Sequence, residues 1–208
     1  MQDHPGGIGA VTEKGKTITN HGGIEHMTLP DGFAPVNLPE GKTLHNNAEF
    51  KWLASSVKIC YEQLDQPLGE EDVTEMKRLF AENLEGKTSR LLNLYGEDQN
   101  APDDSGVYGA LCQSFVCGGA LSPNGSCIDM DDSKWEIRRL GDKNVLFARL
   151  KYITHTGSRS SKEAILVMPQ PCSESGAYYL WLEGSPQELR KHEAGFLSAI
   201  EHGKFKKA

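Results

Sequence analysis

The sequence predicts an α+β protein in which an antiparallel sheet packs against helices. Two observations support this fold class. The last third of the chain holds four stretches in which apolar and polar residues alternate, separated by turn residues. An amphipathic helix follows them, and another begins near residue 70. A four-strand meander closed by a helix indicates an antiparallel sheet with its helices on one face.

The N-terminal part is poor in regular patterns. Residues 1–26 contain six glycines, and we expect a flexible arm there, followed by a single domain over residues 27–208. Pro30-Asp31-Gly32 predicts a turn, with a short strand before it and another over residues 34–38. Residues 49–64 fit both helical and alternating spacing, and we interpret them as a helix.

A helix is predicted from Glu70, where three acidic residues begin a stretch with one apolar face. Gly86 is its expected end. A further turn or two of helix is expected over residues 89–95, followed by a polar loop over residues 97–105.

The four alternating stretches predict strands over residues 135–140, 145–154, 163–168 and 177–182. Ser185 and Pro186 then form a strong helix start, because serine is a preferred N-cap and proline is favoured at the first helical position. Gly203 is the expected end of this last helix.

This C-terminal order resembles the Mog1/PsbP-like family. The strand with Tyr178-Tyr179-Leu180-Trp181-Leu182-Glu183, then Ser185-Pro186, then a helix to Phe205 is similar to that family's last strand and last helix. The resemblance covers roughly the last third of the chain and rests on element order, without a diagnostic motif. It implies a non-catalytic binding or assembly factor, often of the bacterial envelope.

The charge of the chain excludes some partners. With 22 basic and 29 acidic residues the net charge is −7, which disfavours nucleic acid and anionic membranes, since both require a basic face. No apolar run approaches the length of about 20 residues that a transmembrane helix needs. We therefore expect no nucleic-acid partner and no transmembrane segment.

Five cysteines carry the main chemical signal. Three of them, Cys112, Cys117 and Cys127, lie in or beside a stretch over residues 105–128 that holds no charged residue. We expect a disulfide-stapled loop there, with Cys172 as a further candidate partner and the connectivity open. A zinc site is less favoured, because the four thiolates lack the paired short spacing of zinc knuckles. We predict no metal and no cofactor.

Disulfides indicate an oxidising compartment. We therefore predict a periplasmic or secreted protein of the bacterial envelope, and we interpret Met1 to Pro5 as a start placed before a mature chain whose leader has been removed.

The sequence thus predicts a non-enzymatic, extracytoplasmic binding or assembly protein, whose partner is an unknown protein or envelope component. The neutral loop over residues 105–128 would present the contact surface, because no charge has to be desolvated there. The alternative is a small cysteine-dependent hydrolase acting on cell-wall or peptide bonds. Its candidate nucleophile is Cys117, and His155 or His192 would be its base.

Overall fold

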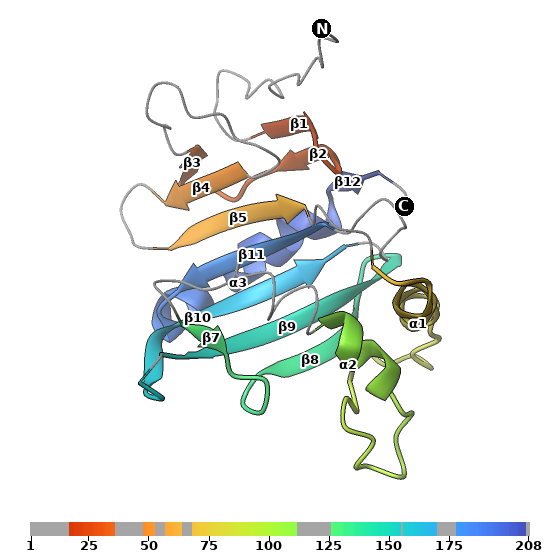
Figure 1. Ribbon diagram of the computed structural model, residues 1–208. Helices are drawn as coiled ribbons and strands as arrows, with labels where there is room; N and C mark the ends of the chain where they lie inside the picture. Colours follow the sequence, from red (N-terminus) through yellow and green to blue (C-terminus); the bar gives the residue numbers. More distant parts are fainter. Residues whose placement is uncertain are drawn as a thin grey trace, which may run out of the picture.

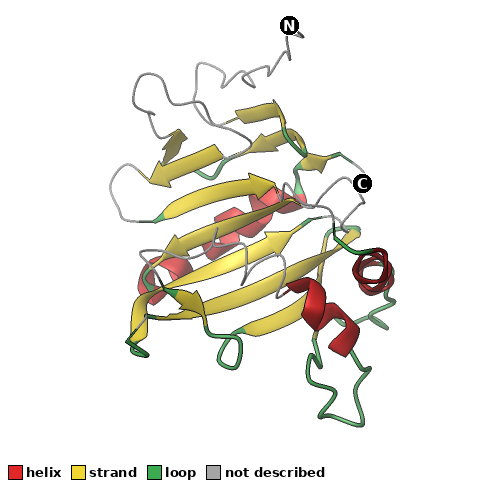
Figure 2. Ribbon diagram, in the orientation of Figure 1, coloured by secondary structure: helices red, strands yellow, loops and turns green. Residues whose placement is uncertain are grey.

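A computed structural model describes residues 17–35, 48–52, 57–63, 68–111, 126–154, 156–169 and 178–206. In this part of the chain, strands and helices form an α+β structure, as predicted (Figure 1). Helices cover a large antiparallel sheet, and a small second sheet lies beside it (Figure 2).

The large sheet has the strand order β3-β4-β5-β11-β10-β9-β8-β6, with β7 paired to the end of β9. Its strands are β3 (Phe33–Pro35), β4 (Ala48–Trp52), β5 (Lys58–Gln63), β6 (Ser89–Leu91), β7 (Cys127–Ile128), β8 (Lys134–Leu140), β9 (Lys143–Ile153), β10 (Arg159–Met168) and β11 (Tyr178–Gly184). Strands β8 to β11 are the predicted meander, and each pairs antiparallel with the next. β6 continues the sheet beyond β8 and forms one of its edges.

The small sheet has the order β1-β2-β12, from β1 (Thr17–His21), β2 (Ile24–Thr28) and β12 (Lys204–Phe205). It joins the two ends of the described chain, because β12 follows the last helix and pairs with β2. The expectation of a loosely attached arm is therefore wrong for residues 17–26, which belong to this sheet. Residues 1–16 lie outside the described residues.

The helices are α1 (Glu70–Phe80), α2 (Ser105–Leu111) and α3 (Pro186–Glu201). The prediction that they share one face of the sheet is wrong, since α3 lies on the face opposite α1 and α2 (Figure 1). Alternation along the strands creates two cores. Trp135, Ile137 and Leu166 pack on the α1 and α2 side, whereas Phe147 and Val167 pack on the α3 side.

Both long helices begin where the sequence predicts. The Ser185 hydroxyl accepts a hydrogen bond from the Glu188 N–H at 3.3 Å, and Pro186 occupies the first turn of α3. α1 begins at Glu70 but ends at Phe80, earlier than expected, because Ala81 takes the C-cap position. The side-chain amide of Asn144 then donates to the carbonyls of Phe80 and Glu82 at 3.0 and 2.8 Å.

Two predicted helices are strands in the structure. Residues 49–64 provide β4 and β5 instead of a helix. β5 lies between β4 and β11, so Ile59 and Tyr61 face one core and Cys60 faces the other. Because both faces of β5 are buried, its sequence does not show the alternation of apolar and polar residues that marks a half-exposed strand. Residues 89–95 were expected to be helical but hold β6, which exists only through its pairing with β8.

Candidate functional site

The residues that the sequence singled out fall in different places. Cys112, Cys117, Cys172 and His155 lie outside the described residues. Cys127 is an exposed, free thiol in β7, so the structure does not show the staple expected there. The ranges described above hold no disulfide and no cluster of metal-ligating side chains.

The remaining possible base, His192, does not meet a described cysteine. His192 lies on α3, where its ring contacts Phe33 at 5.7 Å and faces the Glu188 carboxylate at 3.5 Å. Cys60 is buried in the core on the other side of the sheet. The hydrolase hypothesis therefore depends on Cys117, which lies outside the described residues, as does His155.

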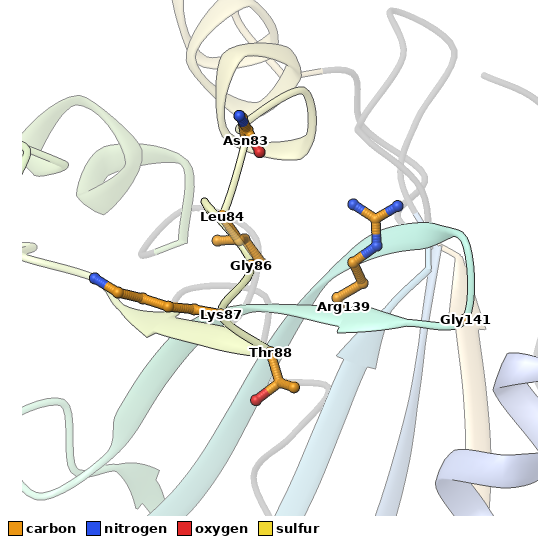
Figure 3. A pocket seen from close by; sticks show the side chains of 7 residues that line it. All are labelled: Asn83, Leu84, Gly86, Lys87, Thr88, Arg139 and Gly141. Carbon is orange, nitrogen blue, oxygen red and sulfur yellow. The ribbon is translucent and has the colours of Figure 1, made fainter.

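A polar groove lies between the end of α1 and the β8–β9 hairpin. Its first part has a volume of about 360 Å³ and is lined by Asn83, Leu84, Gly86, Lys87, Thr88, Arg139 and Gly141 (Figure 3). An adjoining hollow of about 600 Å³ shares Asn83 and Arg139 and extends to Lys77, Asp142 and Lys143. We call the two together the cationic groove.

The rim of the groove is a tight turn with a fixed backbone. Glu85 and Gly86 have φ angles of 51° and 82°, and the Lys87 N–H donates to the Leu84 carbonyl at 2.9 Å. Positive φ at both central positions is the geometry of a type I′ turn, which costs energy at a non-glycine residue such as Glu85. The Asn83 side-chain oxygen accepts from the Glu85 N–H at 3.2 Å and braces the turn.

The cations of the groove differ in whether they already have a partner within the protein. The ammonium group of Lys143 donates to the carbonyls of Ile200 and Gly203 at 3.3 and 3.1 Å, so it closes the end of α3. Lys77, Lys87 and Arg139 are exposed, and none of these three forms an ion pair with a described residue. In Figure 3 the Arg139 side chain rises from β8 toward the side of Asn83, whereas Lys87 extends away from Arg139.

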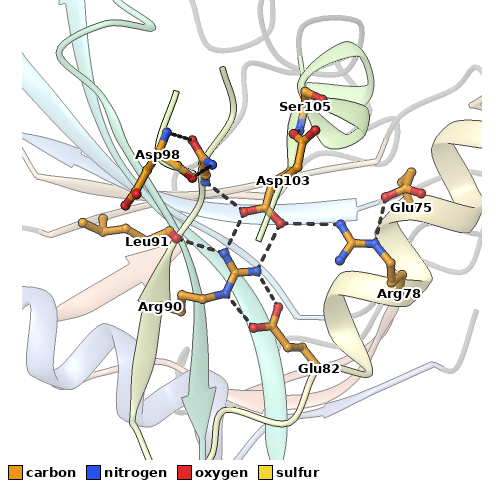
Figure 4. A network of polar contacts seen from close by, with 10 residues as sticks. Glu75, Arg78, Glu82, Arg90, Leu91, Asp98, Asp103 and Ser105 are labelled. Carbon is orange, nitrogen blue, oxygen red and sulfur yellow. Dashed lines mark hydrogen bonds and ion pairs between the residues drawn. The ribbon is translucent and has the colours of Figure 1, made fainter. Parts of the chain in front are cut away.

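A network of charges adjoins the groove at Glu82, which lines the second hollow, and ties β6 to α1 and to the start of α2 (Figure 4). The guanidinium of Arg90 donates to Glu82 at 2.5 and 2.6 Å and to Asp104 at 2.7 and 3.1 Å. Asp104 is fully buried and also accepts from the Asn93 N–H at 2.9 Å. Arg78 approaches Asp104 at 3.5 Å and binds Glu75 at 2.9 Å.

Electrostatics shows how Asp104 stays charged. Burial by itself would raise the pKa of this carboxyl, but hydrogen bonds from Arg90 and from the Asn93 N–H outweigh it, and the pKa lies below its ordinary value. The two carboxylates raise the pKa of Arg90, so the guanidinium stays charged. Because every charge in the network has a partner, we interpret it as the support that holds β6 and the groove rim in place.

Comparison with known proteins gives likenesses among solved structures alone. No family model and no curated protein matches the chain. The chain is similar to a solved cyanobacterial PsbP. That solution structure, of PsbP (CyanoP) from Synechocystis sp. PCC 6803, covers 97% of this chain and 96% of its own at 10% identity, with a TM-score of 0.46. At this TM-score the similarity carries no argument about the family, the groove or the role of the chain.

Sequence reasoning missed the groove. Its cations come from α1, the following turn and β8, so only the folded chain brings them to one place. Single exposed lysines are usual on protein surfaces and give no local signal. Gly86 was noticed as a helix end, and its positive φ places it instead in the turn that shapes the rim.

Proposed function

We propose that the protein is a non-catalytic binding or assembly protein whose cationic groove takes an acidic segment of a partner protein. The observation that carries this proposal is the grouping of Lys77, Lys87 and Arg139, without ion pairs among the described residues, along the two adjoining hollows of the cationic groove, in a chain with a net charge of −7. Carboxylates of a partner would form ion pairs with these three cations, and the same attraction would steer the partner toward the groove.

Arg139 differs from most arginines of the chain in having no ion pair with a described residue. All seven arginines lie in the described part of the chain, and five of them form ion pairs there: Arg78, Arg90, Arg138, Arg149 and Arg159. Arg139 and Arg190 form none with a described residue, and only Arg139 lines a described hollow. A guanidinium in a hollow can bind a carboxylate through two parallel hydrogen bonds, which makes it suited to acidic partners.

The directions of the side chains favour an extended segment over a small anion. Arg139 and Lys87 point to different sides in Figure 3, so they do not converge on one point. A single phosphate or sulfate ion would meet one of them at a time. A peptide with several acidic residues would meet them in succession along its length.

A location outside the cytoplasm stays a prediction, which rests on the spacing of the cysteines and not on the groove. Its test is the intact mass of the native, unreduced protein after alkylation, compared with the same measurement after reduction. A protein from an oxidising compartment should gain fewer alkyl groups before reduction than after it. Equal labelling in freshly isolated material would contradict the prediction.

The groove is tested with a labelled poly-glutamate peptide and fluorescence anisotropy at low salt. We expect the Lys87→Glu/Arg139→Glu double variant to bind at least about tenfold more weakly, because two exposed attractions of up to about 1 kcal/mol each become repulsions. Binding by the unaltered protein should also weaken as salt is added.

The matched control is Lys134→Glu/Arg190→Glu. It changes the net charge equally at two exposed cations outside the groove. An equal loss in both double variants would show that only the net charge matters. Absence of peptide binding by the unaltered protein would refute the acidic-segment proposal outright.

A further inference from the structure

We infer that β6 is an open sheet edge that receives the partner's segment as an added antiparallel or parallel strand. This inference rests on the proposed function, because it states how the acidic segment is held. β6 is the terminal strand in the order of the large sheet, and Thr88, which lines the groove, immediately precedes it.

The register shows which backbone groups are available. The Arg139 N–H donates to the Thr88 carbonyl at 2.8 Å, and the Leu92 N–H donates to the Trp135 carbonyl at 2.9 Å. Arg90 lies between them opposite Ile137, so residues 88, 90 and 92 direct their backbone groups toward β8. Ser89 and Leu91 must therefore direct theirs away from the sheet, where no described strand pairs with them. Of these outward groups the Leu91 carbonyl already accepts from the Arg90 side chain at 3.1 Å, so an added strand would bond mainly to Ser89 and to the Leu91 N–H.

β6 presents one exposed apolar side chain, Leu91, and a second follows the strand at Tyr95. Leu91 is 58% exposed and Tyr95 is 49% exposed, and they are the large hydrophobic residues that stand out to solvent in the part of the chain that the structure describes. Leu91 lies at the end of β6 opposite Glu136 of β8. Tyr95 follows four residues later, contacts the ring of Tyr108 in α2 at 5.4 Å and donates its hydroxyl to Asp131 at 3.0 Å. Proteins usually protect a sheet edge with charge, a bulge or a covering segment. The charge of β6 is Arg90, which Glu82 and Asp104 neutralise, so Leu91 is left to meet a further strand.

The edge is also held ready for pairing. Arg90, at the centre of β6, is fixed by Glu82 and Asp104, and its side chain also donates to the Leu91 carbonyl at 3.1 Å. A strand whose conformation is fixed in advance loses little entropy when a partner strand is added. Strand addition then gives affinity through the backbone and specificity through alternate side chains.

Charge identifies the occupant as a segment of another protein. A second copy would bring its own Lys87 and Arg139 to an edge that already carries these cations, whereas an acidic segment complements them. A partner strand running past Ser89 toward Thr88 reaches the cations of the groove, where acidic residues fit. The segment should therefore combine an apolar residue at Leu91 with acidic residues near Lys87 and Arg139.

The test uses a labelled peptide with alternating glutamate and valine, compared with poly-glutamate of equal length. The alternating peptide should bind more tightly, and Leu91→Lys should remove that advantage. Ser89→Pro should weaken its binding about three- to tenfold, because it removes the outward N–H, whereas Ser89→Ala should bind like the unaltered protein.

Amide hydrogen exchange gives a readout that does not depend on the variants. The amides of Ser89 and Leu91 should exchange rapidly in the free protein and become protected when the peptide binds. Those of Arg90 and Leu92 should be protected in both states, because they already bond to β8.

The outcomes separate the two proposals. Peptide binding that depends on Lys87 and Arg139 but leaves the Ser89 and Leu91 amides unprotected would overturn strand addition and keep the acidic groove. Absence of peptide binding would overturn both. A concentration-dependent dimer in sedimentation that protects the same two amides would assign the edge to a second copy and overturn the proposed occupant.

Discussion

Removal of the Asp104 carboxylate should strongly destabilise the protein. Asp104 is 0% exposed and binds two nitrogens of Arg90 as well as the Asn93 N–H. Deleting one partner of a buried ion pair costs about 3–5 kcal/mol, because the other charge stays buried. Arg90 keeps Glu82 and is 15% exposed, so the lower end, about 3 kcal/mol, is expected.

Urea unfolding followed by circular dichroism measures this loss. For a chain of this size, about 3 kcal/mol corresponds to a melting temperature lower by about 6–12 °C in Asp104→Ala. Asp104→Asn keeps an acceptor for the Asn93 N–H and should lose less, about 1.5–2 kcal/mol. Glu97→Ala removes an exposed carboxylate of the same loop and should stay within about 0.5 kcal/mol of the unaltered protein.

Acid provides a second measurement of the same interaction. Because the pKa of Asp104 is below its ordinary value of 3.8, its contribution is fully present above pH 3.8 and is lost as the pH falls through the lower pKa of the folded state. The stability gap between the unaltered protein and Asp104→Ala should therefore narrow only in strong acid. A loss below about 1 kcal/mol at neutral pH would refute the view that this network is a fully paired buried unit.

Two further predictions concern the attachment of the small sheet. Burial lowers the pKa of His21 below 6.5, and its Nε2 atom is buried without a hydrogen-bond partner among the described residues. The free energy of unfolding should therefore fall as the pH drops below about 6.5. In urea titrations at pH 7 and pH 5, His21→Phe should lose less stability between the two pH values than the unaltered protein does. His192, whose pKa burial also lowers, should contribute to the loss that remains. Tyr61→Phe should cost about 1–3 kcal/mol, because the buried Gly23 N–H loses its acceptor at 2.7 Å, and exchange of the Gly23 amide should accelerate; an unchanged amide would show that another acceptor replaces the hydroxyl.

The C-terminal half could be predicted because its signals are local. Ser185 and Pro186 mark a helix start without help from the rest of the chain, and turn residues separate the strands of the meander. Helix α1 was likewise visible from its acidic first turn and its apolar face. Each of these elements satisfies its own capping or turn chemistry, so sequence neighbours were enough.

The missed elements depend on distant residues. β6 consists of Ser-Arg-Leu, which has no strand preference of its own, and it is ordered by β8 on one side and by Glu82 and Asp104 through Arg90. Asp104 belongs to an Asp-rich stretch that composition assigns to a solvated loop. Its burial follows from Arg90, fourteen residues earlier, and no sequence pattern links the two.

The contrast between paired and unpaired cations connects the network to the proposed function. An arginine at the centre of an edge strand would itself attract acidic segments, and it would compete with the groove for them. Arg90 is instead neutralised by Glu82 and Asp104, so the attraction at this edge comes from Lys87 and Arg139. The acidic residues of a bound strand are thereby directed to the groove end of β6, and its apolar residue is directed to Leu91. Leu91→Lys, which leaves Arg90 and its partners in place, should therefore weaken the preference for an apolar residue at that point while leaving poly-glutamate binding in place.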